Sequence, residues 1–379
     1  MKVRLPAFVL LVVLLLSACQ PARTRTGPVV IDRNELQNFA DAFFTEQMKT
    51  LHIPGVVVVF VQKGEVIFAK GYGYTNLETA APLDPEVSVM RIGSISKPFV
   101  ATAVMQLVEQ GKLDLQADVN RYLTTFQLKD SFPEPVTLAQ LLTHTSGFED
   151  PPYISNTDPQ QVMPLHEYLA ATFVARTHRP GEVYSYSSCG YDLAALIVEE
   201  VSGVPFDQYV DQNIFKPLGM THSRYVLALP LPENSATGYF YQNAVQSPQP
   251  MDYDSGYPSG SIVSTAADMA RFLQAQLREG CYDNICILKP ATIAQMHQPQ
   301  AATPYQGQNA TFGFVEGNAD GVRLLGHSGA IRGFGSILHF FPEHDLGFFL
   351  SFNEECWQTS ACNIIAAFRT QFMAKFLNK

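Results

Sequence analysis

The chain has 379 residues, of which 46% are hydrophobic and 16% charged, and its 25 basic and 35 acidic residues give a net charge of -10. This hydrophobic content supports a large core and excludes a disordered or collagen-like chain. Because the balance is acidic and no basic run occurs, no nucleic acid partner is expected, and a neutral or amphiphilic substrate is favoured.

The N-terminal segment has the pattern of an export signal. Lys2 and Arg4 precede a continuous apolar run over residues 8–16, which is too short to span a bilayer, and small residues follow that run. We therefore expect a signal peptide over residues 1–18 and a short tether over residues 19–33.

The end of this signal, Leu16-Ser17-Ala18-Cys19, resembles the lipobox of bacterial lipoproteins. The resemblance implies that Cys19 becomes the lipidated first residue of the exported chain and attaches it to a membrane. Gln20 rather than Asp follows, which in a Gram-negative cell is similar to a sorting signal for the periplasmic face of the outer membrane. An ordinary cleaved signal with a chance cysteine is the alternative.

Five cysteines remain beyond the signal, and export places them in an oxidising compartment. Their spacing predicts two short disulfide-closed loops, one joining Cys281 to Cys286 and the other joining Cys356 to Cys362. Cys189 is then left over, and we interpret it as a buried small apolar residue rather than a reactive thiol.

The first folded elements follow from hydrophobic periodicity. Apolar residues recur at helical spacing over residues 36–48, and Pro54-Gly55 ends that helix. Two strands over residues 56–62 and 65–72 then flank Lys63-Gly64, which is typical of a hairpin turn.

The middle of the chain is mostly helical in its patterning. Two capping-box spacings, Thr137 with Gln140 and Thr265 with Asp268, mark helix starts. The predicted helices cover residues 97–110, 138–143, 191–201, 206–215 and 266–277.

The last part of the chain returns to strands. We expect strands over residues 323–326, 336–341 and 346–352, a turn over residues 342–345, and an apolar helix over residues 364–376.

No repeat or long linker divides the chain, which predicts one compact α/β unit over residues 34–379. Its antiparallel sheet would be built from both chain ends and flanked by helices, with a mostly helical lobe inserted. The α/β lobe is expected at about residues 34–94 and 300–379, and the helical lobe at about residues 95–299.

Candidate chemistry begins at Ser94-Ile95-Ser96-Lys97. A serine and a lysine three residues apart at a helix start lie on one face, so the Lys97 side chain can reach the Ser94 hydroxyl and make it a nucleophile. Pro98 fits a helix that begins near Ser94, where free backbone N–H groups favour developing negative charge.

Further motifs in a consistent order make this sequence similar to the serine β-lactamase and penicillin-binding-protein superfamily, and closest to its branch of class C β-lactamases, DD-peptidases and esterases. The resemblance runs from about Leu36 to Asn353. It rests on Ser94 to Lys97, residues 141–147 (LLTHTSG), Pro180-Gly181 leading to Tyr186-Ser187-Ser188, residues 217–220 (PLGM), residues 258–260 (PSG) leading to 264–269, and His327-Ser328-Gly329.

The resemblance implies a β-lactamase/transpeptidase-like fold and a role for each motif residue. Ser94 would form an acyl-enzyme, with Lys97 and Tyr186 moving its proton; how the two share that proton is left open. The backbone N–H groups of Ser94 and Ala330 would stabilise the oxyanion.

The second and third elements would bind substrate through Ser188, His327, Ser328 and Gly329. The family usually has Asn where Ser188 stands and its β-lactamases have Lys where His327 stands, which weakens recognition of amides and of anions. A histidine with an ordinary pKa of about 6.5 also predicts that KM for carboxylate-bearing substrates rises from pH 5.5 to pH 8.

These departures favour an esterase or a D-amino-acid peptide hydrolase. A β-lactamase and a non-turnover penicillin-binding sensor or scaffold are the alternatives, so the substrate would be a small acyl ester, a D-amino-acid peptide or a β-lactam. No cofactor is implied, and no metal, because no histidine pair has ligand spacing; His52 and His144 are interpreted as structural.

Overall fold

The computed structural model describes residues 28–129, 131–151, 156–173, 175–319 and 321–378. The predicted signal peptide, Cys19 and most of the predicted tether lie outside these ranges. Within the part of the chain that the structure describes, no helix is both long enough and apolar enough to cross a membrane.

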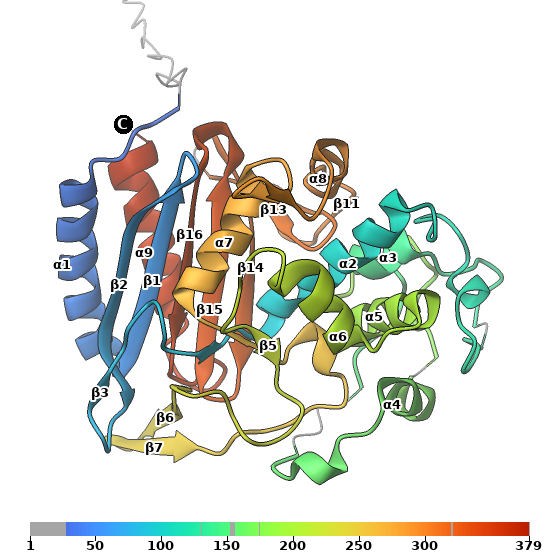
Figure 1. The fold of residues 1–379 in the computed structure, drawn as a ribbon, viewed down its shortest axis with the longest axis horizontal. Coiled ribbons are helices and arrows are strands. Elements are labelled where there is room, and N and C mark those ends of the chain that lie inside the picture. Colours follow the sequence, from blue (N-terminus) through green and yellow to red (C-terminus); the bar gives the residue numbers. More distant parts are fainter. Residues whose placement is uncertain (1–27, 130, 152–155, 174, 320, 379) are drawn as a thin grey trace, which may run out of the picture.

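A nine-stranded antiparallel sheet forms the centre of the molecule, in the order β11-β12-β13-β14-β15-β16-β1-β2-β3 (Figure 1). β1 pairs with β16, so strands from the two ends of the chain lie side by side and confirm the predicted sheet. The strands are β1 (Gly55–Gln62), β2 (Glu65–Asn76), β3 (Ala81–Pro82), β11 (Ala301–Ala302), β12 (Gln308–Ala310), β13 (Val315–Ala319), β14 (Val322–Ile331), β15 (Phe334–Phe341) and β16 (Leu346–Phe352).

One face of the sheet is covered by α1 (Arg33–Leu51) and α9 (Asn363–Phe372), which lie side by side in Figure 1. Their contact is a cluster of phenylalanine rings: the centroid of Phe368 lies 5.2 Å from those of Phe43 and Phe44 and 5.3 Å from that of Phe348. The predicted terminal helix is present, but beyond Phe372 it continues as a π-helical turn, Met373–Leu377.

The other face carries the helices of the middle of the chain (Figure 1). α7 packs on β16 and β1, and α2 packs on α5 to form the larger of two main apolar cores. The helices are α2 (Lys97–Glu109), α3 (Leu138–Leu142), α4 (Leu165–Thr172), α5 (Ser188–Ser202), α6 (Phe206–Val210), α7 (Ala266–Leu277) and α8 (Pro290–Met296).

The middle of the chain also contains short strands that sequence patterning missed. Strands of two or three residues are too short to show a period-2 alternation, which is why no pattern revealed most of them. They are β4 (Met90–Arg91), β5 (Arg224–Tyr225) and β8 (Ile262–Ser264) in one sheet, β6 (Gly238–Gln242) with β7 (Val245–Gln249), and β9 (Cys281–Tyr282) with β10 (Ile285–Cys286).

The capping signals have different outcomes. At α3 the Thr137 hydroxyl accepts from the Gln140 N–H and the Gln140 side chain accepts from the Thr137 N–H, so the predicted capping box is complete. At α7 only half of it forms, because the Asp268 carboxylate accepts from His222 N and Ser223 Oγ instead.

Phe368→Ala should test how far the aromatic cluster holds α9 on the sheet. The side chain is fully buried, so its removal leaves a cavity and should lower the free energy of unfolding by about 3–5 kcal/mol. Urea unfolding followed by circular dichroism measures this, with Gln371→Ala, exposed on the same helix, as the control within about 0.5 kcal/mol of the parent. A loss below 1 kcal/mol for Phe368→Ala would contradict the packing described.

Candidate active site

Ser94 lies in a 3₁₀ turn, Gly93–Ser96, that leads directly into α2. Gly93 has φ +52°, and a Cβ at this position would lie 2.9 Å from the backbone nitrogen of Ala330. Glycine is therefore required for β14 to approach Ser94 so closely. This contact brings together the two backbone N–H groups that the sequence assigns to an oxyanion site.

Lys97 is fully buried and occupies the centre of the site. Its Nζ lies 3.1 Å from Ser94 Oγ, 3.2 Å from Ser188 Oγ and 3.2 Å from the Ser259 carbonyl oxygen. An ammonium has three N–H donors and no acceptor, so these three oxygens satisfy it completely. The structure thus places the lysine against the candidate nucleophile.

Tyr186 lies beside this lysine, with the Lys97 Nζ 4.9 Å from its ring centroid. Two imidazole rings also lie beside the Tyr186 ring: that of His144 is stacked at a centroid distance of 4.3 Å, and that of His327 is tilted at 6.3 Å. His144 Nδ1 accepts a hydrogen bond from Ser187 N at 3.0 Å, and burial lowers the pKa of His144, so the imidazole is neutral. The sequence indicates a structural role for His144, and in the structure its ring packs against Tyr186 and helps to position it.

The hydroxyl of Tyr186 has no hydrogen bond to any described residue, and 42% of the side chain is exposed. Its contact with Lys97 is made through the ring face. Catalytic hydrogen bonds are often incomplete without substrate, so this geometry leaves the hydroxyl available to a bound molecule.

The third motif lies on β14, as the sequence predicts. A Cβ on Gly329 would lie 2.0 Å from the Ile92 carbonyl oxygen, so only glycine lets β14 pass this close to the segment before Ser94. Ser328 is exposed, and His327 is buried with its Nδ1 2.7 Å from the Ser328 carbonyl oxygen.

Two cavities meet at Ser94. The larger, of about 620 Å³, is bordered by Tyr186, His327 and Ser328, and the smaller, of about 180 Å³, by Lys97 and three aspartates. The residues that border both are Ser94, Ser188, Ala330 and Trp357. The predicted catalytic and binding residues therefore come together around one cleft, in which the sequence had not singled out Trp357.

Aspartates that the sequence did not single out organise this cleft. Asp150 accepts from the backbone N–H groups of Ser188 and Cys189, at 2.8 and 2.9 Å, at the start of α5. Asp192 accepts from Ser259 N at 2.9 Å and so helps to hold the residue whose carbonyl oxygen accepts from Lys97.

Two aspartates of the smaller cavity have raised pKa values. Burial raises the pKa of Asp192 well above its usual range, and burial also raises the pKa of Asp254 to about 6. The sequence does not reveal that Asp192 is buried in the site, because a single acidic residue in a helix is normally a solvated surface charge.

The two predicted cysteine pairs are bonded in the structure, Cys281 to Cys286 and Cys356 to Cys362. Cys189 is buried as a free cysteine, and burial raises the pKa of its thiol. A thiol in this state is protonated at neutral pH and is a poor nucleophile.

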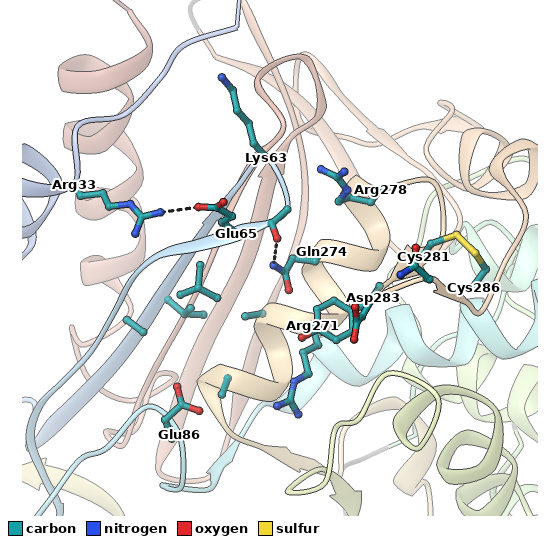
Figure 2. A pocket seen from close by; sticks show the side chains of 18 residues that line it. Arg33, Lys63, Glu65, Glu86, Arg271, Gln274, Arg278, Cys281, Asp283 and Cys286 are labelled. Atoms are coloured by element: carbon teal, nitrogen blue, oxygen red, sulfur yellow. Dashed lines mark hydrogen bonds and ion pairs between the residues drawn. A yellow bond between two sulfur atoms is a disulfide. The ribbon is translucent and has the colours of Figure 1, made fainter.

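A cavity of about 1220 Å³, larger than either cavity at Ser94, lies elsewhere, beside α7 and the Cys281–Cys286 loop (Figure 2). Several of its polar side chains already have partners within the protein: Arg33 pairs with Glu65 at 2.8 Å, and the Gln274 side chain donates to the Gly64 carbonyl at 2.8 Å. The described residues that line it include no serine and no histidine, so it lacks the nucleophile that lies beside Lys97 in the other site. Size alone therefore does not identify the site.

No three histidine, cysteine, aspartate or glutamate side chains within the described ranges gather in an arrangement that could hold a metal ion.

Comparison with known proteins agrees with this arrangement. The family model described as Beta-lactamase matches residues 40–364, which includes every motif of the cleft. The chain belongs to the β-lactamase family.

This chain is similar to Protein flp of Staphylococcus aureus (strain N315), to which it is 26% identical over 322 residues. The match covers 83% of this chain and 62% of the length of that relative.

Solved structures show the same fold. The octameric penicillin-binding protein homologue from Pyrococcus abyssi is 28% identical to this chain, with a TM-score of 0.74. The match covers 87% of this chain and 74% of the homologue. EstCE1, described as a hydrolase with promiscuous acyltransferase activity, is 23% identical with a TM-score of 0.75, covering 87% of this chain and 96% of its own.

One expectation from the sequence is wrong for this family member. Burial, with the nearby positive charge of Lys97, lowers the pKa of His327 to about 3, so the imidazole does not change charge between pH 5.5 and 8. An ordinary pKa was expected because the motif residues alone do not reveal that His327 is buried on β14.

His327 should therefore contribute nothing to the pH dependence of KM for a carboxylate-bearing ester, divided by KM for a neutral ester of the same size, between pH 5.5 and 8. His327→Gln, which is neutral at every pH in this range, should give the same pH profile of this ratio as the parent. Steady-state kinetics at several pH values measure it. A ratio that rises with pH in the parent and becomes flat in His327→Gln would show that His327 is protonated at low pH.

Proposed function

We propose that this chain is a serine hydrolase that forms an acyl-enzyme on Ser94 and acts on small acyl esters or D-amino-acid peptides. The observation that carries the proposal is the 3.1 Å distance from Lys97 Nζ to Ser94 Oγ inside a cleft that also contains Tyr186 and the β14 edge. A nucleophile within hydrogen-bond reach of a proton acceptor, which is itself held by further groups, is the arrangement covalent catalysis requires.

The reactive form has Lys97 as the neutral amine, with one proton lost to solvent, so that Nζ accepts from the Ser94 hydroxyl. In the first half-reaction Ser94 Oγ bonds to the substrate carbonyl carbon while its proton passes to this amine. Lys97 is favoured over Tyr186 for this step because its nitrogen already contacts Oγ, whereas the Tyr186 hydroxyl contacts neither group. The oxyanion would be stabilised by the N–H groups of Ser94 and Ala330. The carbon–oxygen bond to the leaving group then breaks, and Tyr186, exposed to the cleft, delivers the proton to the departing alcohol.

In the second half-reaction water attacks the acyl carbon and its proton passes to the Tyr186 phenolate left by the first half-reaction. The bond from the acyl carbon to Ser94 Oγ then breaks as the Lys97 ammonium returns a proton to Oγ, which releases the carboxylic acid product. The smaller cavity borders both Ser94 and Lys97 and is lined by carboxyl groups, so it is a suitable place for this water.

An ester is favoured over an amide or a β-lactam by two features of the cleft. The Ser188 hydroxyl, which stands where the family has an amide side chain, is engaged by Lys97 at 3.2 Å. His327 stands where β-lactamases have a cationic lysine, and here it is neutral. Both features remove groups that would hold an acylamino or carboxylate group.

We further propose that the protein belongs to the class C-related branch that includes DD-peptidases and esterases, and that it is exported and lipidated at Cys19. The lipid would attach it to the periplasmic face of the outer membrane in a Gram-negative cell. These proposals rest on the sequence motifs alone.

Ser94→Ala should abolish both labelling by a serine-reactive fluorophosphonate and hydrolysis of any ester substrate, because the attacking oxygen is lost. Lys97→Ala and Tyr186→Phe should each slow acylation by about 10² to 10⁴, the usual range for a positioned proton-transfer group. Label incorporation and stopped-flow kinetics measure these effects.

Lys70→Ala and Tyr74→Phe are matched controls, since both residues lie on β2 and line neither cavity. They should retain parental labelling and turnover. Labelling of a serine other than Ser94, or full activity in Ser94→Ala, would refute the proposal.

A further inference from the structure

Trp357 is the only tryptophan of the sequence, and 62% of its side chain is exposed. A single exposed apolar side chain is common on protein surfaces and does not by itself indicate a site. This one is unusual in its neighbours, because it borders both cavities together with Ser94, Ser188 and Ala330. It therefore lies at the point where the two sides of a bound ester would diverge from the reacting carbonyl.

The backbone of Trp357 is held firmly at this point. The buried carboxylate of Glu355 accepts from Trp357 N at 3.0 Å, from Cys356 N at 3.1 Å and from Gly333 N at 3.0 Å. Gly333 belongs to the turn between β14 and β15, so Glu355 joins the Trp357 loop to the strand that carries Ala330. The disulfide from Cys356 to Cys362 closes the same loop.

The larger cavity offers further apolar surface next to the indole. Tyr305, 66% exposed, borders it, as do Tyr184, Leu324 and Ile365. An exposed indole on a fixed backbone provides a large contact area while little conformational freedom is lost on binding.

We propose that Trp357 is a specificity-determining residue that receives an apolar, preferentially aromatic, group of the substrate adjacent to the scissile bond. The inference rests on the proposed function, since it assigns part of the substrate to the same cleft. The substrate class is then an ester with an aryl or alkyl group on its acyl side or on its alcohol side.

Two ester series distinguish these two sides. One keeps a constant phenol leaving group and changes the acyl group from acetyl to phenylacetyl, and the other keeps an acetyl group and changes the alcohol from methanol to benzyl alcohol. The preference in each series is the kcat/KM value of the phenylacetyl or benzyl ester divided by that of the acetyl or methyl ester. In one of the two series, Trp357→Ala should reduce this preference by about 10- to 100-fold. The loss should come mainly from KM, because apolar contact is similar in the ground state and the transition state.

Trp357→Phe should restore most of this preference, whereas a structural disturbance would not be corrected by another aromatic ring. Tyr74→Ala, which removes an exposed aromatic side chain that lines neither cavity, should leave both ratios at the parental value. Unchanged ratios in Trp357→Ala, or a parent enzyme with no preference for the aromatic ester in either series, would overturn the inference. Turnover of esters in the same experiment would still support the proposed function. Absence of any ester turnover would overturn both.

Fluorescence gives an independent readout, because all tryptophan emission comes from Trp357. Boronic acids bind serine hydroxyls reversibly: a boron–oxygen bond forms and the hydroxyl proton passes to a base. Phenylboronic acid should shift the emission to shorter wavelength, and methylboronic acid should not. Inhibition by both acids with identical emission changes would overturn the inference but not the role of Ser94.

Discussion

The burial of the Lys97 amine is the constraint on which the rest of the site depends. A cationic nitrogen without water needs oxygen partners, and its three partners come from three separate segments: Ser94 before α2, Ser188 at the start of α5, and the Ser259 carbonyl. Asp192 helps to hold the third of these by accepting from the Ser259 N–H. The same lysine, once it gives up its proton, is positioned to activate the serine beside it.

The fold supplies the second wall of the site. The nine-stranded sheet presents β14 to the turn that carries Ser94, and glycines at positions 93 and 329 let the two backbones approach closely. Because β14 is fixed within the sheet, Ala330 and Ser328 are held on a rigid element. The phenylalanine cluster under α9 stabilises the opposite face of the sheet and so holds β14 and β16 in place.

Much of this arrangement could be predicted from the sequence. The long strands and helices show clear periodicity, and Ser94, Lys97, Tyr186 and the motif at residues 327–329 carry recognisable local chemistry. The contributions of Asp192 and Trp357 could not be predicted, because they depend on segments that are distant in the sequence. The neutral state of His327 could not be predicted either, since burial sets its charge and is a property of the assembled cleft.

The central claim is that one acyl-enzyme on Ser94 lies on the reaction path, and partitioning of product with added methanol tests it most directly. Esters that share one acyl group but differ in their leaving group should give the same ratio of methyl ester to free acid, because all of them pass through the same acyl-enzyme. Ratios that change with the leaving group would show direct attack of water on the bound substrate and would contradict the account.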